Sequence, residues 1–349
     1  VWLTTTTPTG RERVKQALGD RVRLSYVPYD TPDAVARFLA RITSHVLVIM
    51  ETEIWPNLIA MSVARQLPVV LVNARLSARS HAKYQRFAGL VEGTFGQISA
   101  CAAQTDADAE RLVSLGIHRE RVKVTGSIKF DVRIPPSVRE RGAVLRRIWG
   151  VDRSVFIAAS THEGEEAVVL GSFADILERH PKALLVLVPR HPERFARVAA
   201  LARRRGYVTV QHSDAPVACA DAQVYLGDTM GELPTFYAGA DLAFVGGSLV
   251  DIGGHNVLEP ASLGLPVITG PNVRNFADIT ARLSEEGAAR VVKDSAELTR
   301  AVLDWLGDAN SRHHAGERGS EFVQRNRGAL DDMLSQILEH SATVDPVRH

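Results

Sequence analysis

The stretch that decides the fold is residues 246–260, which read GGSLVDIGGHNVLEP. The apolar run LAFV at 242–245 leads into it, and ASLGLPVITGP at 261–271 follows it. We interpret this order as a strand, a glycine-rich loop, a short helix and a second strand. Glycine lacks a Cβ and a helix N-terminus has free N–H groups, so both can approach a ligand closely. We therefore interpret the loop, including Gly253 and Gly254, as part of a nucleotide-sugar site.

Two polar side chains at the end of this stretch support the same prediction. Asn256 and Glu259 are three residues apart, so a helix would present both on one face, with Val257 and Leu258 between them. A carboxylate at this place suits a pair of sugar hydroxyls, as an acidic residue does in dinucleotide-binding folds. We expect this short helix to contact the nucleotide.

Composition places the chain among ordinary globular proteins and excludes some functions. The chain has 349 residues, enough for two domains, of which 45% are hydrophobic and 23% charged. The net charge of +1 gives no indication of nucleic-acid binding. The two cysteines, Cys101 and Cys219, are expected to be buried free thiols. The chain starts in a strand-like run without Met, and we expect that sequence precedes it.

Short apolar runs alternate with helical patterns along the whole chain. Helical spacing is clear, for example, at 31–42, 138–149 and 167–180. This alternation predicts an α/β protein with parallel sheets and helices on both faces. The expected strands are 1–5, 22–27, 46–50, 69–72, 98–103, 122–126, 155–159, 183–188, 224–226, 242–245 and 266–269.

A linker is expected at 129–137, where KFDVRIPPS carries two consecutive prolines between a strand and a basic helix. It predicts an N-terminal Rossmann-like domain at 1–134 and a C-terminal nucleotide-sugar-binding domain at 135–349. An amphipathic helix is expected at about 321–338, and it could pack back on the first domain.

Polar motifs follow three further strands of the second half, where open α/β sheets bind ligands. Arg190 in PRHPER (189–194) could clamp a phosphate, or belong to a solvated basic turn. GDTMGEL (227–233) could cap a helix through Asp228 or Thr229, or face a nucleotide with its backbone. Ser160, Thr161 and His162 could likewise cap a helix or form the wall of a cleft.

The first half has the same arrangement. The motifs ETEIWP (51–56), NARLSARS (73–80) and GSIKFD (126–131) each follow an expected strand, so we expect them at one edge of the sheet. Asp106 and Asp108 have the spacing of a metal-binding Asp-x-Asp, but helix capping explains them better. The histidines lack metal-ligand spacing, and we expect no metal and no cofactor.

Taken together, these motifs resemble the 3-deoxy-D-manno-octulosonic acid (Kdo) transferase family of lipopolysaccharide synthesis. The matching segments span nearly the whole chain in the family's order. They are TPTG (7–10), METEIWPNLI (50–59), NARLS (73–77), GSIKFD (126–131), STHEGE (160–165), PRHPER (189–194), GDTMGE (227–232) and the opening stretch.

The resemblance implies a GT-B fold, in which two Rossmann-like domains with parallel sheets face each other across a cleft. It implies an inverting glycosyltransferase that moves Kdo from CMP-Kdo to a phosphorylated lipid A precursor at the cytoplasmic face of the bacterial inner membrane. Glu51 and Lys129 would stabilise the transition state. The residues that would hold CMP are Pro189, Arg190, Met230, Gly231, Glu232, Asn256 and Glu259.

One part of the family pattern does not match. The family's general base is a glutamate in an N-terminal segment that also carries an apolar membrane anchor, and neither occurs in these residues. We therefore assign no base, and expect the chain as printed to be weak or inactive by itself.

A basic cluster in the first half could meet the acceptor. Arg75, Arg79, Lys83 and Arg86 lie close in sequence, and Tyr84, Phe87 and Leu90 are interleaved on an expected helix. We expect this face to contact acceptor phosphates or the anionic membrane surface. A solvated basic helix is the alternative.

Two other functions remain open at this stage. A UDP-sugar 2-epimerase shares the fold and a site at the strand ends, but would bind UDP and would not explain the basic cluster. A catalytically silent nucleotide-sugar binding protein is the other alternative.

Overall fold

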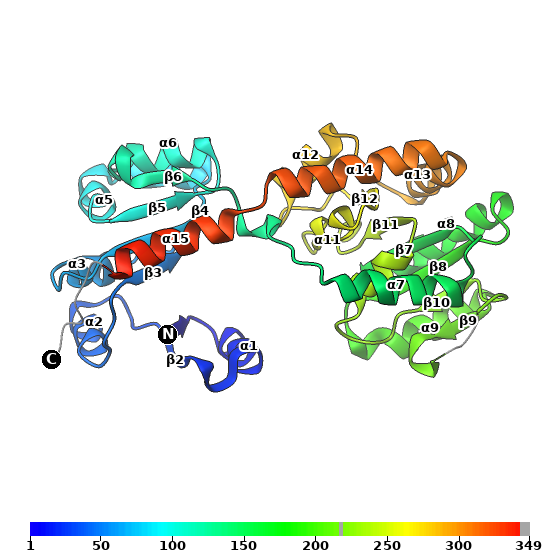
Figure 1. Cartoon of the computed structure of the whole chain (residues 1–349), viewed down its shortest axis with the longest axis horizontal. Coiled ribbons are helices and arrows are strands. Elements are labelled where there is room, and N and C mark those ends of the chain that lie inside the picture. The colour runs from blue at the N-terminus through cyan, green and yellow to red at the C-terminus, as the bar shows by residue number, and fades with distance from the viewer. Residues whose placement is uncertain (216–218, 343–349) are drawn as a thin grey trace. The chain divides into compact units, whose positions relative to one another are not determined.

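The computed structural model describes residues 1–215 and 219–342, which form two compact α/β units (Figure 1). Unit 1 comprises Val1–Asp131 and the chain from Arg327 on, and unit 2 comprises Val132–Asn326. The sequence predicts a boundary at 134. In the structure the chain leaves unit 1 after Asp131, within the expected linker, and returns to it after Asn326.

Unit 2 is built on a seven-stranded sheet in which every strand pair is parallel. The strand order is β13-β12-β11-β7-β8-β10-β9. The chain extends from β7 through β8 to one side and from β11 through β12 to the other, so the order reverses between β7 and β11. The strands are β7 (Val155–Thr161), β8 (Leu184–Pro189), β9 (Thr209–Gln211), β10 (Val224–Leu226), β11 (Leu242–Val245), β12 (Val267–Thr269) and β13 (Ala289–Val291).

Helices pack on both faces of this sheet, because alternate strand residues point to opposite sides. Phe156 lies in one core with Phe173 and Trp305, whereas its neighbour Ile157 lies in a second core with Trp149. The helices are α7 (Pro136–Trp149), α8 (Glu165–Arg179), α9 (Phe195–Arg204), α10 (Leu233–Gly239), α11 (Leu258–Ser262), α12 (Ala277–Glu285), α13 (Ser295–Gly307) and α14 (Ala309–Arg325).

Unit 1 contains a parallel four-stranded sheet in the order β3-β4-β5-β6 and a parallel pair, β1-β2. The strands are β1 (Trp2–Thr5), β2 (Arg23–Tyr26), β3 (Leu47–Met50), β4 (Val69–Ala74), β5 (Ala100–Ala103) and β6 (Val122–Val124). The helices are α1 (Pro8–Leu18), α2 (Pro32–Leu39), α3 (Pro56–Val63), α4 (Ala78–Gln85), α5 (Ala88–Phe95), α6 (Asp106–Ser114) and α15 (Ala329–Ala342). None of the helices in the described residues is long and apolar enough to span a bilayer.

The last helix differs from the expected one. The sequence predicts one helix over 321–338, but α14 ends at Arg325 and α15 begins at Ala329. Gly328 has a φ of 104°, which breaks the helix, and the Asp131 carboxylate accepts the N–H groups of Gly328 and Leu330 at 2.8 Å each. Met333 of α15 then packs on the face of the sheet that carries Val70 of β4.

Two strands were not expected from the sequence, β9 and β13. Each has only three residues, lies at an edge of the seven-stranded sheet and is partly exposed. Because the side chains of these edge strands are partly exposed, the strands need no continuous apolar run of the kind that marks a buried strand in the sequence.

A buried carboxylate joins the loops after β7 and β11. Glu165, at the start of α8, is 0% exposed. Its Oε2 accepts the N–H groups of His162 at 2.9 Å and Gly247 at 2.7 Å, and its Oε1 accepts those of Ser248 at 3.0 Å and Leu249 at 2.9 Å. Four backbone donors of two loops are therefore fixed by one side chain.

The adjoining glycine allows this close approach. A Cβ at Gly246 would lie 2.7 Å from the Ser160 carbonyl oxygen and 2.9 Å from Glu165 Oε2. No side chain fits between these two loops, which explains a glycine at the end of β11.

We predict that Glu165→Gln destabilises the chain by about 2–4 kcal/mol. An amide nitrogen cannot accept a hydrogen bond, so either orientation of the introduced amide leaves two of the four buried N–H groups without an acceptor. Urea unfolding followed by circular dichroism measures the change.

The matched control is Glu163→Gln, because Glu163 is two residues away but forms only an exposed pair with Arg197. That substitution should change the unfolding free energy by less than about 0.5 kcal/mol. Equal stabilities of the two variants would contradict the role of Glu165.

Candidate functional site

The candidate site of unit 2 lies at the carboxyl ends of β7, β8, β10 and β11. These four strands are adjacent in the sheet, and the reversal of strand order between β7 and β11 is where open α/β sheets bind ligands. The topology therefore brings together the polar motifs that follow these strands.

Three backbone N–H groups of the glycine-rich loop are already hydrogen-bonded within the protein. We expected its backbone N–H groups to face a ligand, but those of Gly247, Ser248 and Leu249 are bound to the Glu165 carboxylate. Gly253 and Gly254 are buried and have φ angles of 103° and 76°, a backbone region that side chains disfavour. These glycines fold the loop.

A pair of histidines lies at the reversal of strand order. Their Nε2 atoms, on His162 after β7 and His255 after β11, are 2.8 Å apart. The ring of His191, after β8, meets that of His162 edge to face at 5.3 Å between centroids. Burial and then the neighbouring His162, Arg190 and His191 lower the pKa of His255 to about 4. Burial is also the main cause that lowers the pKa of His162.

Arg190 contributes the cation of this part of the site. Its backbone N–H donates to the carbonyl of Thr161 at 3.0 Å, so the residues after β8 are tied to the end of β7. Arg194, four residues on, forms a two-pronged ion pair with Glu166 at 2.6 and 3.1 Å, and its side chain is only 15% exposed. Arg194 is thus structural, whereas no acid pairs with Arg190 among the described residues. Ser160, within β7, has a φ of 55° and lies where the pairing of β7 with β8 is irregular, between Ala159 and Thr161.

The motif after β10 does not cap α10. Helix α10 begins without a side-chain cap, so the capping interpretation of Asp228 and Thr229 is wrong. The Asp228 carboxylate instead accepts the N–H of Ser213 at 2.9 Å and its hydroxyl at 2.6 Å. Burial alone would raise the pKa of Asp228, but these bonds and one from Gln211 lower it overall.

Glu232 lies beside a histidine that the sequence did not reveal as its neighbour. Its Oε2 is 3.2 Å from His212 Nε2, and His212 Nδ1 is hydrogen-bonded to the Tyr225 hydroxyl at 2.6 Å. Glu232 follows Met230, which is 58% exposed, and Gly231, which has a φ of 84°.

Asn256 and Glu259 meet, but not on one helix as expected, because Asn256 precedes α11, which begins at Leu258. Asn256 Nδ2 donates to Glu259 Oε1 at 3.1 Å, and Asn256 Oδ1 accepts the N–H of Leu258 at 3.0 Å. Burial raises the pKa of Glu259, against the opposing effect of the Asn256 bond. Val257 and Leu258 are buried, so they support the helix from the core.

In unit 1 the structure brings the ends of β3, β4 and β6 to one edge. The N–H of Glu51 donates to the Val72 carbonyl at 2.8 Å, and Asn73 Oδ1 accepts the N–H of Ile128 at 3.3 Å. Ile128 begins the 3₁₀ turn that contains Lys129. Glu51 has a φ of 58°, so the chain turns directly after β3.

The structure divides the expected helix into two, and the basic cluster lies on and beside the first of them, α4. The break between α4 and α5 falls at Arg86 and Phe87, and Tyr84 turns inward to pack on Phe95 at 5.7 Å between ring centroids. Phe87 remains 67% exposed, and the side chain of Leu90 lies outside the described residues. The exposed basic side chains are Arg75, Arg79, Lys83 and Arg86.

The Asp-x-Asp motif is structural. Thr105 caps α6 by accepting the N–H of Asp108, and the buried Asp108 accepts the N–H of Leu76 at 2.8 Å. Within the part of the chain that the structure describes, no group of three His, Cys, Asp or Glu side chains is arranged to hold a metal.

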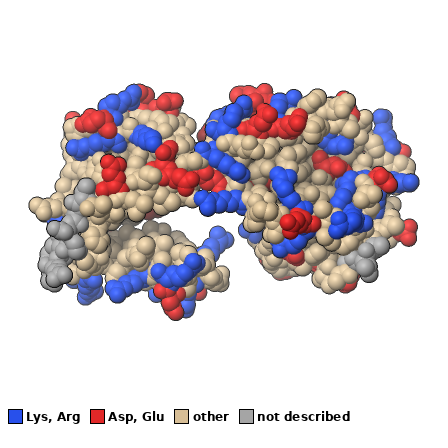
Figure 2. Space-filling model, in the orientation of Figure 1, with Lys and Arg blue, Asp and Glu red and all other residues tan. Residues whose placement is uncertain are grey.

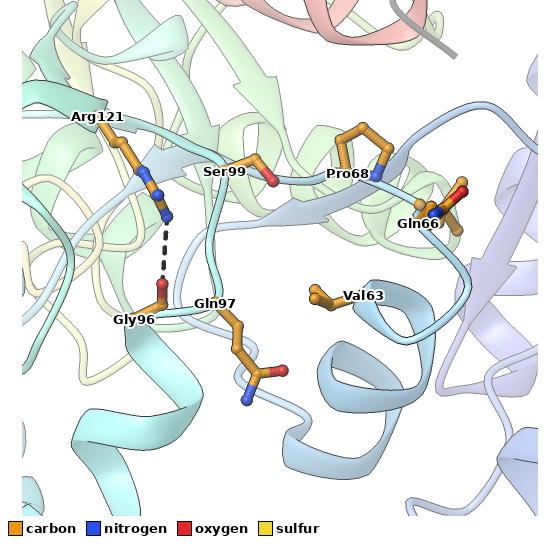
Figure 3. Close-up of a pocket in the computed structure, with 8 residues that line it drawn as sticks. Val63, Gln66, Pro68, Gly96, Gln97, Ser99 and Arg121 are labelled. Atoms are coloured by element: carbon orange, nitrogen blue, oxygen red, sulfur yellow. Dashed lines mark hydrogen bonds between the residues drawn. The ribbon is translucent and has the colours of Figure 1, made fainter. Parts of the chain in front are cut away.

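A cavity of about 540 Å³ in unit 1 lies away from these motifs (Figure 3). Its lining includes Pro68, Ser99 and Arg121, which precede β4, β5 and β6. It is therefore at the amino ends of the strands, opposite the edge that carries Glu51 and Lys129. On the face shown in Figure 2, basic and acidic side chains are interspersed over each unit, in keeping with the net charge of +1.

Comparison with known proteins identifies the family. The family model "3-Deoxy-D-manno-octulosonic-acid transferase (kdotransferase)" matches residues 1–132, and "Glycosyl transferases group 1" matches residues 154–322. The chain is 42% identical to the 3-deoxy-D-manno-octulosonic acid transferase of Haemophilus influenzae over 98% of this chain and 81% of that protein. It is 37% identical to the Bordetella pertussis transferase, over 97% and 80% of the two chains.

Solved structures agree with this assignment. The C-terminal CMP-Kdo binding domain of WaaA from Acinetobacter baumannii is 34% identical, with a TM-score of 0.52, over 54% of this chain and 98% of that one. The UDP-GlcNAc 2-epimerase of Neisseria meningitidis has a TM-score of 0.61 over 97% of this chain and 91% of that one, at 14% identity, and shares the fold alone. The predicted GT-B fold class, family and glycosyltransferase activity are confirmed. This chain belongs to the 3-deoxy-D-manno-octulosonic acid transferase family of glycosyltransferases.

Proposed function

We propose that this chain transfers Kdo, with inversion, from CMP-Kdo to a phosphorylated lipid A precursor at the cytoplasmic face of the inner membrane. The observation that carries the proposal is the 42% identity to a Kdo transferase over 98% of the chain. The structure also supports the proposal, because polar motifs lie together at the carboxyl ends of the neighbouring strands β7, β8, β10 and β11.

In this proposal unit 2 binds the donor. Arg190 contacts the phosphate of CMP, since a guanidinium can form two hydrogen bonds with it. Asn256 and Glu259 bind hydroxyls of the ribose, and a carboxylate oxygen of Glu232 binds the nucleoside. The other proposed contacts are Ser160, Thr161, His162, Pro189, Met230, Gly231, Gly253, Gly254, Val257 and Leu258.

Unit 1 binds the acceptor in the same proposal. An acceptor hydroxyl attacks the anomeric carbon of Kdo and gives up its proton to a general base, to which we assign no residue of this chain. The bond between the anomeric carbon and the phosphate oxygen breaks, and CMP leaves with its electrons. Negative charge then grows on the leaving phosphate, where Arg190 stabilises it electrostatically. In this proposal Glu51 and Lys129 also stabilise the transition state.

We predict that the chain binds CMP more tightly than UDP, and that Arg190→Ala and Glu259→Ala each weaken CMP binding about 10–100-fold, because each removes a charge-assisted hydrogen bond. Isothermal titration calorimetry with CMP, CDP and UDP measures these affinities.

The control for this experiment is Arg197→Ala. Arg197 is a nearby arginine whose exposed side chain pairs with Glu163, so its loss should leave CMP affinity unchanged. A preference for UDP would favour the 2-epimerase alternative, and equal weakening by all three variants would contradict a specific role of Arg190.

The basic cluster of α4 is proposed to meet the anionic membrane surface or the acceptor phosphates. Arg79, Lys83 and Arg86 are exposed, and the exposed ring of Phe87 adjoins them. Each basic side chain near an anionic membrane contributes about 1 kcal/mol of attraction, and an aromatic ring suits the interface.

We predict that combined charge reversal, Arg79→Glu, Lys83→Glu and Arg86→Glu, reduces binding to vesicles containing anionic lipid at least tenfold. Co-sedimentation measures the bound fraction, which should also fall as salt is raised. The matched control reverses three exposed arginines of α7, Arg139, Arg141 and Arg147. Equal losses in both triple variants would mean that net charge, and not this face, governs binding.

A further inference from the structure

The His162–His255 pair lies where the strand order reverses, next to Arg190. The two Nε2 atoms are 2.8 Å apart, and the ring planes differ by 6°. The ring of His255 also packs closely on the loop, since a Cβ at Gly247 would lie 2.9 Å from its Cδ2 atom. Both imidazoles are therefore fixed in place by the loops that Glu165 joins.

Acidic side chains near the pair are already engaged. Glu165 accepts four backbone N–H groups, Glu166 pairs with Arg194 at 2.6 Å, and Asp251 pairs with Arg274. Glu193 is 4.0 Å from His191 and mostly exposed. The charged and titratable groups around the pair are Glu165, Glu166, Arg190, His191, Glu193, Arg194, Asp251 and Arg274.

The charges around the pair are of both signs. Glu165 and Glu166 act on His162 and favour its protonated form, whereas Arg190 and His191 act on His255 and disfavour its protonated form. The Arg190 guanidinium and imidazoles that can take up a proton, at the ligand-binding edge of a parallel sheet, are together complementary to an anion.

The pair can hold one additional proton without losing its hydrogen bond. In the neutral state one ring donates through Nε2–H and the other accepts through Nε2. A proton from solvent can then bind Nδ1 of the donor ring, giving an imidazolium hydrogen-bonded to a neutral imidazole. A second proton would place N–H groups on both Nε2 atoms and break the contact.

We propose that His162, His255 and Arg190 form an anion subsite that takes up one proton when the anionic group of the donor binds. The proposal rests on the proposed function, which provides a donor with a phosphate and a sugar carboxylate. Either group has the chemistry required, because both present negatively charged oxygens to Arg190 and to the pair once it has taken up its proton.

The direction of the pH dependence follows from linkage. Without ligand the pair is neutral near pH 7, because the pKa of His255 is about 4. A bound anion favours the protonated form and raises the pKa of the pair. Between the free and bound pKa values, binding takes up a proton, so affinity strengthens as the pH falls and weakens as it rises.

The test is calorimetric titration of the chain with CMP between pH 5.5 and 8.5, compared with His255→Asn and His162→Gln. These variants remove the shared proton site but keep a polar side chain and leave Arg190 in place. CMP also titrates, with a pKa of about 6, but equally for every protein. We expect the ratio of wild-type to variant affinity to rise as the pH falls, by up to about tenfold per unit.

One further ligand, one control variant and a second readout complete the test. Cytidine, which lacks a phosphate, should bind with no difference in pH dependence between wild type and variants. His313→Gln, on the exposed face of α14, should behave as the wild type. As a second readout, histidine ¹⁵N shifts of the wild type at pH 7 should report imidazolium formation when CMP is added.

Each outcome has a distinct meaning. If the difference appears only with a CMP-linked sugar acid, the subsite binds the sugar carboxylate. If CMP and the sugar nucleotide bind but wild type and variants keep parallel pH profiles, the subsite proposal is overturned while the proposed function stands. If no cytidine ligand binds, both are overturned.

Discussion

The buried carboxylate of Glu165 is the interaction on which the rest of unit 2 depends. It binds four backbone N–H groups from the loops after β7 and β11, and these loops carry the two histidines at the reversal of strand order. A buried carboxylate is costly unless it is hydrogen-bonded, and here both oxygens are saturated. One buried side chain therefore joins the two loops at the edge of the sheet that carries the site.

Much of the architecture could be predicted from the sequence because buried parallel strands have continuous runs of apolar residues. The central strands β7, β8 and β11 have that form, and so do β3 and β4. Edge strands β9 and β13 do not, and the break before α15 depends on Asp131, which is distant in sequence. Local patterns cannot reveal a helix start that is capped from 197 residues away.

The same distinction applies to the site. The strand-end motifs could be placed together because parallel strands end at one edge. Asn256 and Glu259 do meet, but Asn256 lies before the helix, so the expected helix spacing does not explain their contact. The contacts of His255 and His212 were not recognised, since neither residue has a metal-ligand spacing or a sequence neighbour with which it acts. Only the fold shows that His212 lies beside Glu232 and that His255 meets His162.

The backbone N–H groups of the glycine-rich loop that bind Glu165 are not free to bind a phosphate. In many nucleotide-binding folds backbone N–H groups of such a loop bind the phosphate, and an amide does not titrate near neutral pH. Here the amides of Gly247, Ser248 and Leu249 are bound to Glu165, so positive charge at this edge comes from side chains. Arg190 supplies a guanidinium, whereas burial lowers the pKa of both His162 and His255, so that they become charged only when something stabilises their protonated form. The Glu165 carboxylate thus joins the two loops, and in our proposal anion recognition falls to side chains whose charge can respond to the ligand.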